Sequence, residues 1–353
     1  MGSMIRFSGK LYPTFFLFWF AVLFTGGISY ADTLISSNIS ANTTWTVAGS
    51  PYNVTSFVTV SEEATLIINP GVTVQFGPSG GLWIQGSIVA NATANEQIHF
   101  TGDSSSPGSW YGIYLINSGS GAFSNCTFEY GGRYYNSTYS NTNLAKTGTG
   151  SLSITRCTFS NSSGNGLRVF ANSGIVSASE STFSNNSSGV SIGLNISSDF
   201  INDTCIFTGN TYDVQIETNG DITTNTIWDL SSSYSMYLAG DLTVVSGATL
   251  TVASGTVIKS ASARGIWVSG TLSVQGTAGA PVYFTDWRDD SVGGDANNNG
   301  NDDAAAPGWW RGIYVEDAGS ADLTYCNVRY GGYFYNSTFG NTEFAKTGSG
   351  NLS

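Results

Sequence analysis

The sequence has few charged side chains, and this scarcity excludes several classes of protein. Only 10% of the 353 residues are charged, against about 25% in an average globular domain. The net charge is −12 at pH 7. We expect no nucleic acid partner, because nucleic acid binding needs a basic face that displaces phosphate counterions. Runs rich in Lys, Glu, Ala and Leu, which are typical of long helices, are missing after the N-terminal segment.

Histidine, cysteine and proline are also scarce, with 1, 4 and 7 residues. There is no CxxC pair, so we do not expect a zinc site. His99 is the single histidine and is replaced by Tyr283 in a later repeat, which argues against a Ser-His-Asp site. Glycine is abundant, with 44 residues, and 41% of the chain is hydrophobic. With Thr, Val, Ile, Tyr and Phe dominating, this composition predicts an all-β protein with many turns and a large core.

The N-terminus has the pattern of a secretory signal peptide. Arg6 and Lys10 form a basic segment, an apolar run follows over Phe15–Phe24, and Ser29–Ala31 offers small residues for cleavage. The apolar run is about ten residues, short of the ~20 that span a bilayer, which weighs against the alternative of an uncleaved anchor. We predict that residues 1–31 are removed, that no stable transmembrane segment remains, and that the protein is secreted or held at the cell surface.

A long internal repeat is the strongest signal in the chain. Residues 107–153 align with residues 307–353 at a constant offset of 200. Upstream, residues 58–103 align with residues 242–287 at an offset of 184. The two offsets differ because of one insertion, which lies between Trp287 and Pro307.

These offsets define the expected organisation of the mature chain. We predict an N-terminal cap over residues 32–57, since the end of a repeat stack needs covering. A first β-helix repeat unit follows over residues 58–241, and a second unit, incomplete, over residues 242–353. Because the second copy stops inside a segment that the first copy continues, we expect the native chain to continue past Ser353.

A shorter period lies inside the repeat unit. Cys157, Ser181 and Cys205 lie 24 residues apart, and each is followed two residues later by Phe. Short apolar strands that recur at this period predict a β-solenoid, in which each coil pairs with the next about 4.8 Å away and equivalent side chains stack in ladders. We therefore expect coils of about 24 residues.

Several motifs resemble secreted right-handed parallel β-helix proteins of the pectin-lyase-like group. They are the string Ala64–Phe76, the GxWxGI modules at Gly108–Ile113 and Gly308–Ile313, and the Tyr-Gly-Gly turns at Tyr130 and Tyr330. The resemblance implies a right-handed parallel β-helix. The motifs are specific for the fold and carry little information about activity.

The cysteines leave two alternatives open. Cys126, Cys157 and Cys205 occupy one repeated position, and Cys326 repeats Cys126. The position is either a buried ladder of small side chains or a site for a disulfide between Cys126 and Cys157, which the coil spacing and a secreted location permit. Ser181 at the equivalent position favours the ladder.

The insertion predicts a calcium loop. The segment from Asp295 to Asp303 resembles loops of the EF-hand and dockerin type, with oxygen ligands at alternate positions and Gly300 at the sixth. Its twelfth position is Ala306 and no helices flank it, so we expect weak Ca²⁺ binding that holds the loop. The alternative is a solvated acidic loop, since Asp, Asn and Gly are turn formers. The predicted ligands are Asp295, Asn297, Asn299, Asn301 and Asp303, with Asp289 and Asp290 as candidates to complete the shell.

The loop after each Tyr-Gly-Gly turn is rich in aromatic residues. Exposed rings stack on the apolar faces of sugars, so these loops predict binding of a polysaccharide or cell-surface glycan. In the alternative interpretation, the rings fold back and cover the flank of the solenoid. Trp83, Trp110, Trp267 and Trp310 recur at equivalent strand-like positions, and we expect packing or lateral-face roles for them in preference to ligand binding. The candidate ligand-binding residues are Tyr134, Tyr135, Tyr139, Tyr333, Phe334 and Tyr335.

Two hypotheses for function follow. The first is a non-catalytic, adhesin-like or carbohydrate-binding β-helix protein of the cell surface, because the chain combines a signal peptide with a large tandem duplication and lacks the Gly-His-Gly and Arg-Ile-Lys elements of polygalacturonases. The alternative is a polysaccharide lyase or glycoside hydrolase whose catalytic residues are not recognisable or lie beyond residue 353. A hydrolase needs two suitably spaced carboxylates, and a lyase of this group needs a base beside a calcium-held uronate. Arg288 is the basic residue nearest an acidic cluster, and we assign no catalytic residue.

Overall fold

The structure is a computed structural model. It describes Gly2 and residues 32–136, 138, 139, 141–170, 174–217, 220–230, 232–297, 299, 300 and 303–353. The predicted signal peptide and the predicted calcium ligand Asn301 therefore lie outside the described residues. In the part of the chain that the structure describes, no helix is long and apolar enough to cross a membrane.

Among the described residues the strands form five sheets, named A to E here. Sheet A contains β1 (Thr33–Ile35), β3 (Tyr52–Val54), β6 (Thr73–Phe76), β9 (Ile98–Gly102), β12 (Cys126–Glu129), β15 (Thr158–Ser160), β18 (Thr182–Ser184) and β20 (Ile206–Thr208). Sheet B contains β4 (Phe57–Val60), β7 (Gly81–Ile84), β10 (Ile113–Leu115), β13 (Thr142–Lys146), β16 (Asn165–Val169), β19 (Ser188–Ile192), β21 (Tyr212–Ile216), β24 (Met236–Leu238), β27 (Val257–Ser260), β30 (Val282–Asp286) and β33 (Cys326–Val328).

The three smaller sheets complete the coils. Sheet C contains β2 (Thr43–Trp45), β5 (Thr65–Ile68), β8 (Ser87–Asn91), β11 (Ser120–Ser124), β14 (Leu152–Thr155) and β17 (Val176–Ser179). Sheet D contains β22 (Gly220–Ile222), β25 (Leu242–Val244), β28 (Gly265–Val268), β31 (Gly312–Val315) and β34 (Phe344–Lys346). Sheet E contains β23 (Thr226–Trp228), β26 (Thr249–Ala253), β29 (Thr271–Gln275) and β32 (Ser320–Thr324). Two short 3₁₀ helices, η1 (Val47–Gly49) and η2 (Ser198–Phe200), lie in the connections.

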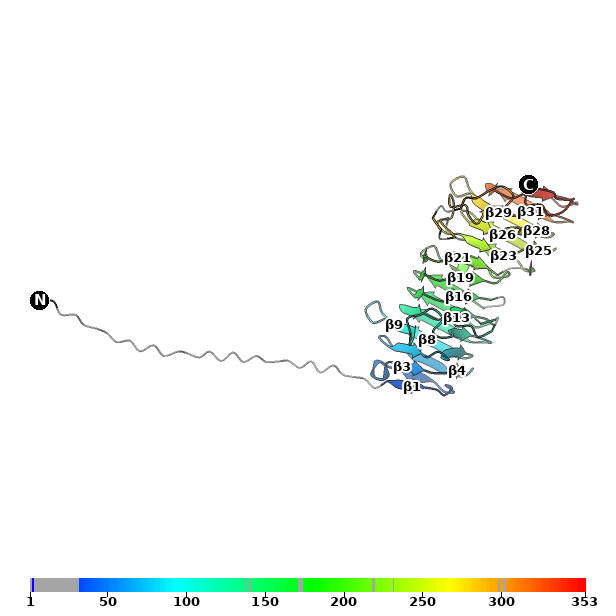
Figure 1. Cartoon of the computed structure of the whole chain (residues 1–353). Coiled ribbons are helices and arrows are strands. Elements are labelled where there is room, and N and C mark those ends of the chain that lie inside the picture. The colour runs from blue at the N-terminus through cyan, green and yellow to red at the C-terminus, as the bar shows by residue number, and fades with distance from the viewer. Residues whose placement is uncertain are drawn as a thin grey trace.

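The chain is a right-handed parallel β-helix, which confirms the fold predicted from the sequence. Figure 1 shows the coils stacked along one axis, with β1 and β3 at one end and β29 and β31 at the other. The pairing register gives the coil lengths. Thr158 pairs with Thr182, 24 residues later, whereas Thr127 pairs with Thr158, 31 residues later. The segment predicted as a cap has strands of its own, since β1 pairs with β3 and β2 pairs with β5.

The core follows from strand alternation. In β8, Ile88 and Ala90 are buried while the intervening positions are more exposed, as a half-buried strand requires. The coils turn at sharp corners, where Asn125, Arg156 and Glu180 have φ near +50° at equivalent places. Such single left-handed residues let one strand end and the next begin at an angle.

Equivalent side chains stack in ladders inside the solenoid. Phe128 and Phe159 stack with ring centroids 4.4 Å apart, and Phe159 stacks on Phe183 at 5.2 Å. The four cysteines are free thiols, and Cys157 N–H donates to the hydroxyl of Ser181 at 3.1 Å. Cys126, Cys157 and Cys205 are buried, as a ladder of small side chains requires.

Equivalent strands of the two repeat units lie in different sheets, because the second unit starts one strand further along the coil. In the first unit β4, β7 and β10 lie in sheet B, but their counterparts β25, β28 and β31 lie in sheet D. Likewise β6, β9 and β12 lie in sheet A, whereas their counterparts β27, β30 and β33 lie in sheet B. Features that share a face in the first unit therefore appear on a different face in the second unit.

Candidate functional site

An aromatic cluster covers the outside of β4, β7 and β10 in sheet B. Phe57 lies at its centre, 4.8 Å from the ring of Tyr111, 5.3 Å from Trp83 and 5.0 Å from Tyr135. Tyr139 meets Trp83 edge-on at 4.8 Å. We call this cluster the first platform, and it consists of Phe57, Trp83, Tyr111, Tyr114, Tyr135 and Tyr139.

Hydrogen bonds to the backbone fix the rings of the first platform. The hydroxyl of Tyr114 donates to the carbonyl of Tyr111 at 3.0 Å, and burial raises the pKa of Tyr114 above its usual range. The side-chain oxygen of Asn136 accepts the backbone N–H groups of Thr138 and Tyr139 at 2.9 and 3.0 Å. The Asn136 turn folds the loop back, so that Tyr135 and Tyr139 reach the sheet.

The second repeat unit carries the same construction on sheet D. The ring of Tyr314 lies 5.7 Å from Trp267 and 4.4 Å from Phe339, and its hydroxyl donates to the Arg311 carbonyl at 3.0 Å. Asn336 accepts two backbone N–H groups as Asn136 does. We call this cluster the second platform, and it consists of Asp241, Trp267, Arg311, Tyr314, Tyr335 and Phe339.

The two platforms differ at two positions that face each other. Asp241 stands where the first platform has Phe57, and Arg311 stands where it has Tyr111. The aromatic stack is thereby replaced by an ion pair, in which Nη1 of Arg311 lies 3.0 Å from both carboxylate oxygens of Asp241. Among the described residues, the buried Nε of Arg311 has no hydrogen-bond partner.

A shallow depression accompanies this exchange on the second platform. Its volume is about 420 Å³. It is lined by Asp241, Thr243, Trp267, Arg311, Glu316 and Tyr335. The guanidinium of Arg311 lies 5.0 Å from the Tyr335 ring centroid, so ring faces and charged groups meet at one surface.

The predicted ligand-binding aromatics divide into two groups. Tyr135, Tyr139 and Tyr335 pack into the platforms, as the fold-back alternative describes. Tyr134, Tyr333 and Phe334 lie outside the platforms and are exposed by 67%, 43% and 57%, while Tyr135 and Tyr335 keep exposures of 43% and 40% within the platforms. Asp241 and Arg311 are not among the predicted site residues, although the repeat offsets make them equivalent to Phe57 and Tyr111.

Trp110 and Trp310 serve packing, as expected. Both are buried, and their indole N–H groups donate to the carbonyls of Glu129 and Arg329 at 2.8 and 2.7 Å. The same bond in both units explains why the GxWxGI module keeps its tryptophan.

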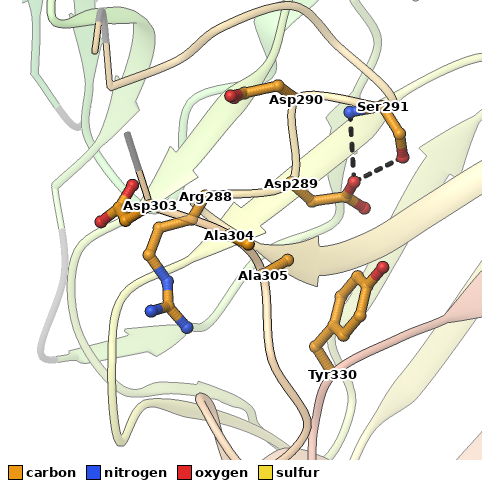
Figure 2. Close-up of a pocket in the computed structure, with 8 residues that line it drawn as sticks. All are labelled: Arg288, Asp289, Asp290, Ser291, Asp303, Ala304, Ala305 and Tyr330. Atoms are coloured by element: carbon orange, nitrogen blue, oxygen red, sulfur yellow. Dashed lines mark hydrogen bonds between the residues drawn. The ribbon is translucent and has the colours of Figure 1, made fainter. Parts of the chain in front are cut away.

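The acidic insertion forms a second candidate site beside β30. Figure 2 shows the residues that line its pocket of about 390 Å³, with two hydrogen bonds joining Ser291 to Asp289. Asp289 is 3% exposed, accepts a hydrogen bond from the Thr285 hydroxyl at 2.7 Å and lies 3.5 Å from Arg329. Protein donors thus already surround this predicted calcium ligand.

The predicted calcium loop is closed by its own hydrogen bonds. The carboxylate of Asp295 accepts the backbone N–H groups of Asn299 and Gly300 at 3.2 and 2.8 Å. Asp303 accepts the amide of Asn297 at 3.1 Å. Within the described residues, no three His, Cys, Asp or Glu side chains lie close enough to hold a metal ion together.

Basic and acidic groups approach each other under this insertion. Lys259 in β27 is buried, and its ammonium donates to the carbonyl of Gly294. Burial lowers the pKa of Lys259, and the carboxylates of Asp290 and Asp289 oppose that shift. Two coils away, burial raises the pKa of Asp213 to about 6. This set of opposite charges was not recognised in the sequence because its members come from separate coils.

Comparison of the chain with protein-family models, with curated proteins and with solved structures yields no match. The geometry of the two platforms and of the insertion is therefore the basis for assigning a function.

Proposed function

We propose that the protein is a non-catalytic β-helix of the cell surface that binds glycans through its platforms. One observation carries this proposal, namely that the platform occurs twice with the same fixing hydrogen bonds. A ring cluster needed only to cover the sheet would not need an ion pair at its centre. The exchange of Phe57 and Tyr111 for Asp241 and Arg311 changes the chemistry of an outer surface while the supporting rings stay in place.

The second platform has the composition of a sugar-binding surface. The ring of Tyr335 is 40% exposed and offers a face on which the apolar side of a pyranose stacks. Asp241 and Glu316 supply acceptors for sugar hydroxyls, and the guanidinium of Arg311 supplies donors. The resemblance to the pectin-lyase-like group supports this ligand class only as an analogy of fold.

The test is binding to a panel of soluble polysaccharides, namely xyloglucan, glucomannan, β-1,3-glucan and homogalacturonan. Affinity electrophoresis would compare the protein with Tyr335→Ala and with Ile67→Thr. Ile67 is 40% exposed on sheet C, away from both platforms, and serves as the matched control. We expect Tyr335→Ala to weaken binding about tenfold, as loss of a stacking ring does, and Ile67→Thr to leave it unchanged. Absence of binding to every member of the panel would contradict the proposal.

A second candidate function is polysaccharide cleavage, and the charges under the insertion favour it. Asp289 and Asp290 line the pocket of the insertion, and the buried Lys259 interacts with both carboxylates. A lysine of lowered pKa is able to act as a base. Incubation with the same four polysaccharides would be followed by the absorbance of unsaturated products and by release of reducing ends. Turnover that is abolished by Lys259→Met would replace the non-catalytic proposal.

Export of the protein rests on the signal peptide. We propose that cleavage follows Ala31 and that the mature chain begins at Asp32. N-terminal sequencing of protein recovered outside the cells of an expression host tests this directly. An intact N-terminus on membrane-bound protein would instead support the anchor.

A further inference from the structure

We infer that the two platforms face different directions, so that one molecule bridges two separate glycan chains. This inference rests on the proposed function, because it takes both platforms as binding surfaces. Binding by itself does not determine how the two surfaces are oriented, and their orientation decides whether one molecule contacts two chains.

The arrangement follows from the displacement of the repeat by one strand. The rings of the first platform stand on β7 and β10 of sheet B, and those of the second on β28 and β31 of sheet D. Within one coil, β27 of sheet B is followed by β28 of sheet D after a corner over residues 261–264, where Ala263 has φ +55°. The two sheets are therefore separate sides of the solenoid.

The axial separation also counts against one straight chain contacting both platforms. Sheet B runs from β4 through seven further strands to β24, after which β25 begins the second platform on sheet D. At a coil spacing of about 4.8 Å, the platforms lie roughly 35 Å apart along the axis. A glycan lying along sheet B would have to pass around the corner to reach Trp267. Separate chains meet no such constraint.

An in-register duplication would have given the opposite arrangement. Had 184 residues made a whole number of coils, Trp83 and Trp267 would stand in one row on one sheet, and the two platforms would face the same direction. The irregular segment that contains η2 (Ser198–Phe200) lies where sheets A and C end and sheets D and E begin. Because of this segment, the two platforms lie on different sides of the solenoid.

Bead aggregation separates bridging from binding. Latex beads are coated, in four separate batches, with xyloglucan, glucomannan, β-1,3-glucan or homogalacturonan. Bound protein is measured by depletion and aggregation by turbidity. The variants are Tyr135→Ala in the first platform (43% exposed), Tyr335→Ala in the second, the double variant, and Ile67→Thr as control.

The expected pattern distinguishes the inference from the proposed function. The unmodified protein and Ile67→Thr should bind and aggregate beads of at least one batch. Each single platform variant should still bind but should require at least about tenfold more protein to aggregate beads, since bridging needs two sites on one molecule. The double variant should do neither. If the unmodified protein binds no batch, the proposed function fails and the inference with it.

Two results would overturn the inference while leaving glycan binding in place. One is binding without aggregation by the unmodified protein. The other is aggregation by both single variants at the concentration that the unmodified protein needs, which would point to self-association. Light scattering of each protein without beads measures self-association directly, and a monomer is the expected result for all five.

Discussion

The guanidinium of Arg311 lies 3.0 Å from both carboxylate oxygens of Asp241, although the two residues are 70 positions apart in the chain. The equivalent residues of the first unit, Tyr111 and Phe57, stack at 4.8 Å with their ring planes 18° apart. Each pair is complementary within itself, whereas a mixed pair would place a charge against a ring without a counter-ion. The two positions therefore depend on each other, and each residue fits the partner in its own repeat unit.

Exchange of this pair tests that dependence. Asp241→Phe alone leaves the partly buried Arg311 without its carboxylate, and Arg311→Tyr alone leaves the carboxylate without its cation. We expect each single variant to lose about 1 kcal/mol of unfolding free energy, a small figure because Asp241 is 38% exposed. The double variant should recover most of this loss by restoring the stack of the first platform. Urea unfolding of all four proteins gives the coupling energy, and strictly additive losses would contradict the prediction.

A buried asparagine ladder should contribute more to stability than any platform residue. Asn186 accepts the N–H of Ser162 at 3.0 Å and donates its amide to the carbonyl of Phe159 at 3.0 Å and to Asn210 at 3.1 Å. Asn186→Ala leaves these buried groups unsatisfied, and we expect a loss of about 3 kcal/mol in unfolding free energy.

The matched control for the ladder is Asn202→Ala. Asn202 is exposed and accepts one backbone hydrogen bond from Thr204 at 3.0 Å. We expect it to cost about 1 kcal/mol or less. Equal shifts of the urea midpoint for the two variants would show that the ladder has no special role.

The coil and its ladders could be predicted from the sequence because they depend on local repetition. The recurrence of Cys157, Ser181 and Cys205, each followed by Phe at the second position, fixes both the period and the stacked core. Each such residue meets the next one a single coil away. A residue type that recurs once per coil is therefore sufficient to predict which side chains stack.

The placement of the second platform could not be predicted in the same way. It depends on how many strands the irregular segment around η2 adds to the coil count, and that number has no local signature. The charges under the insertion pose the same problem, since Asp213 and Lys259 meet only when β21, β24 and β27 stack. An alignment of the two repeat copies does point to Asp241 and Arg311, because both positions differ between copies that are otherwise similar.

Calcium should raise the melting temperature of the protein if the insertion holds the ion. Asp295 already accepts the N–H groups of Asn299 and Gly300, which brings its carboxylate to the turn at Gly300. We expect a rise of a few degrees at millimolar Ca²⁺, which disappears in Asp295→Ala/Asp303→Ala. Asp322→Ala, at an exposed position of β32, controls for the loss of surface charge. Calorimetry that detects no binding at millimolar Ca²⁺ would remove the site.

Asp213 should make the stability fall as the pH rises towards neutrality. Burial raises its pKa to about 6, while the N–H of Ser235 and the charge of Lys259 act in the opposite direction. The folded state thus keeps a proton on Asp213 between about pH 4 and about pH 6 that the unfolded chain has released, and unfolding free energy decreases with pH over that window. From the size of the shift we expect a loss of about 3 kcal/mol, complete somewhat above pH 6.

Asp213→Asn provides the comparison for this pH dependence. The asparagine oxygen is able to accept the same hydrogen bond from Ser235, which Asp213 accepts at 3.2 Å, but it does not titrate. Urea unfolding between about pH 4 and about pH 7 should show the stability of Asp213→Asn rising relative to the unmodified protein as the pH increases. Asp203→Asn, at an exposed position, controls for the change in net charge. A constant difference between Asp213→Asn and the unmodified protein across this range would mean that the carboxylate titrates alike in the folded and unfolded states.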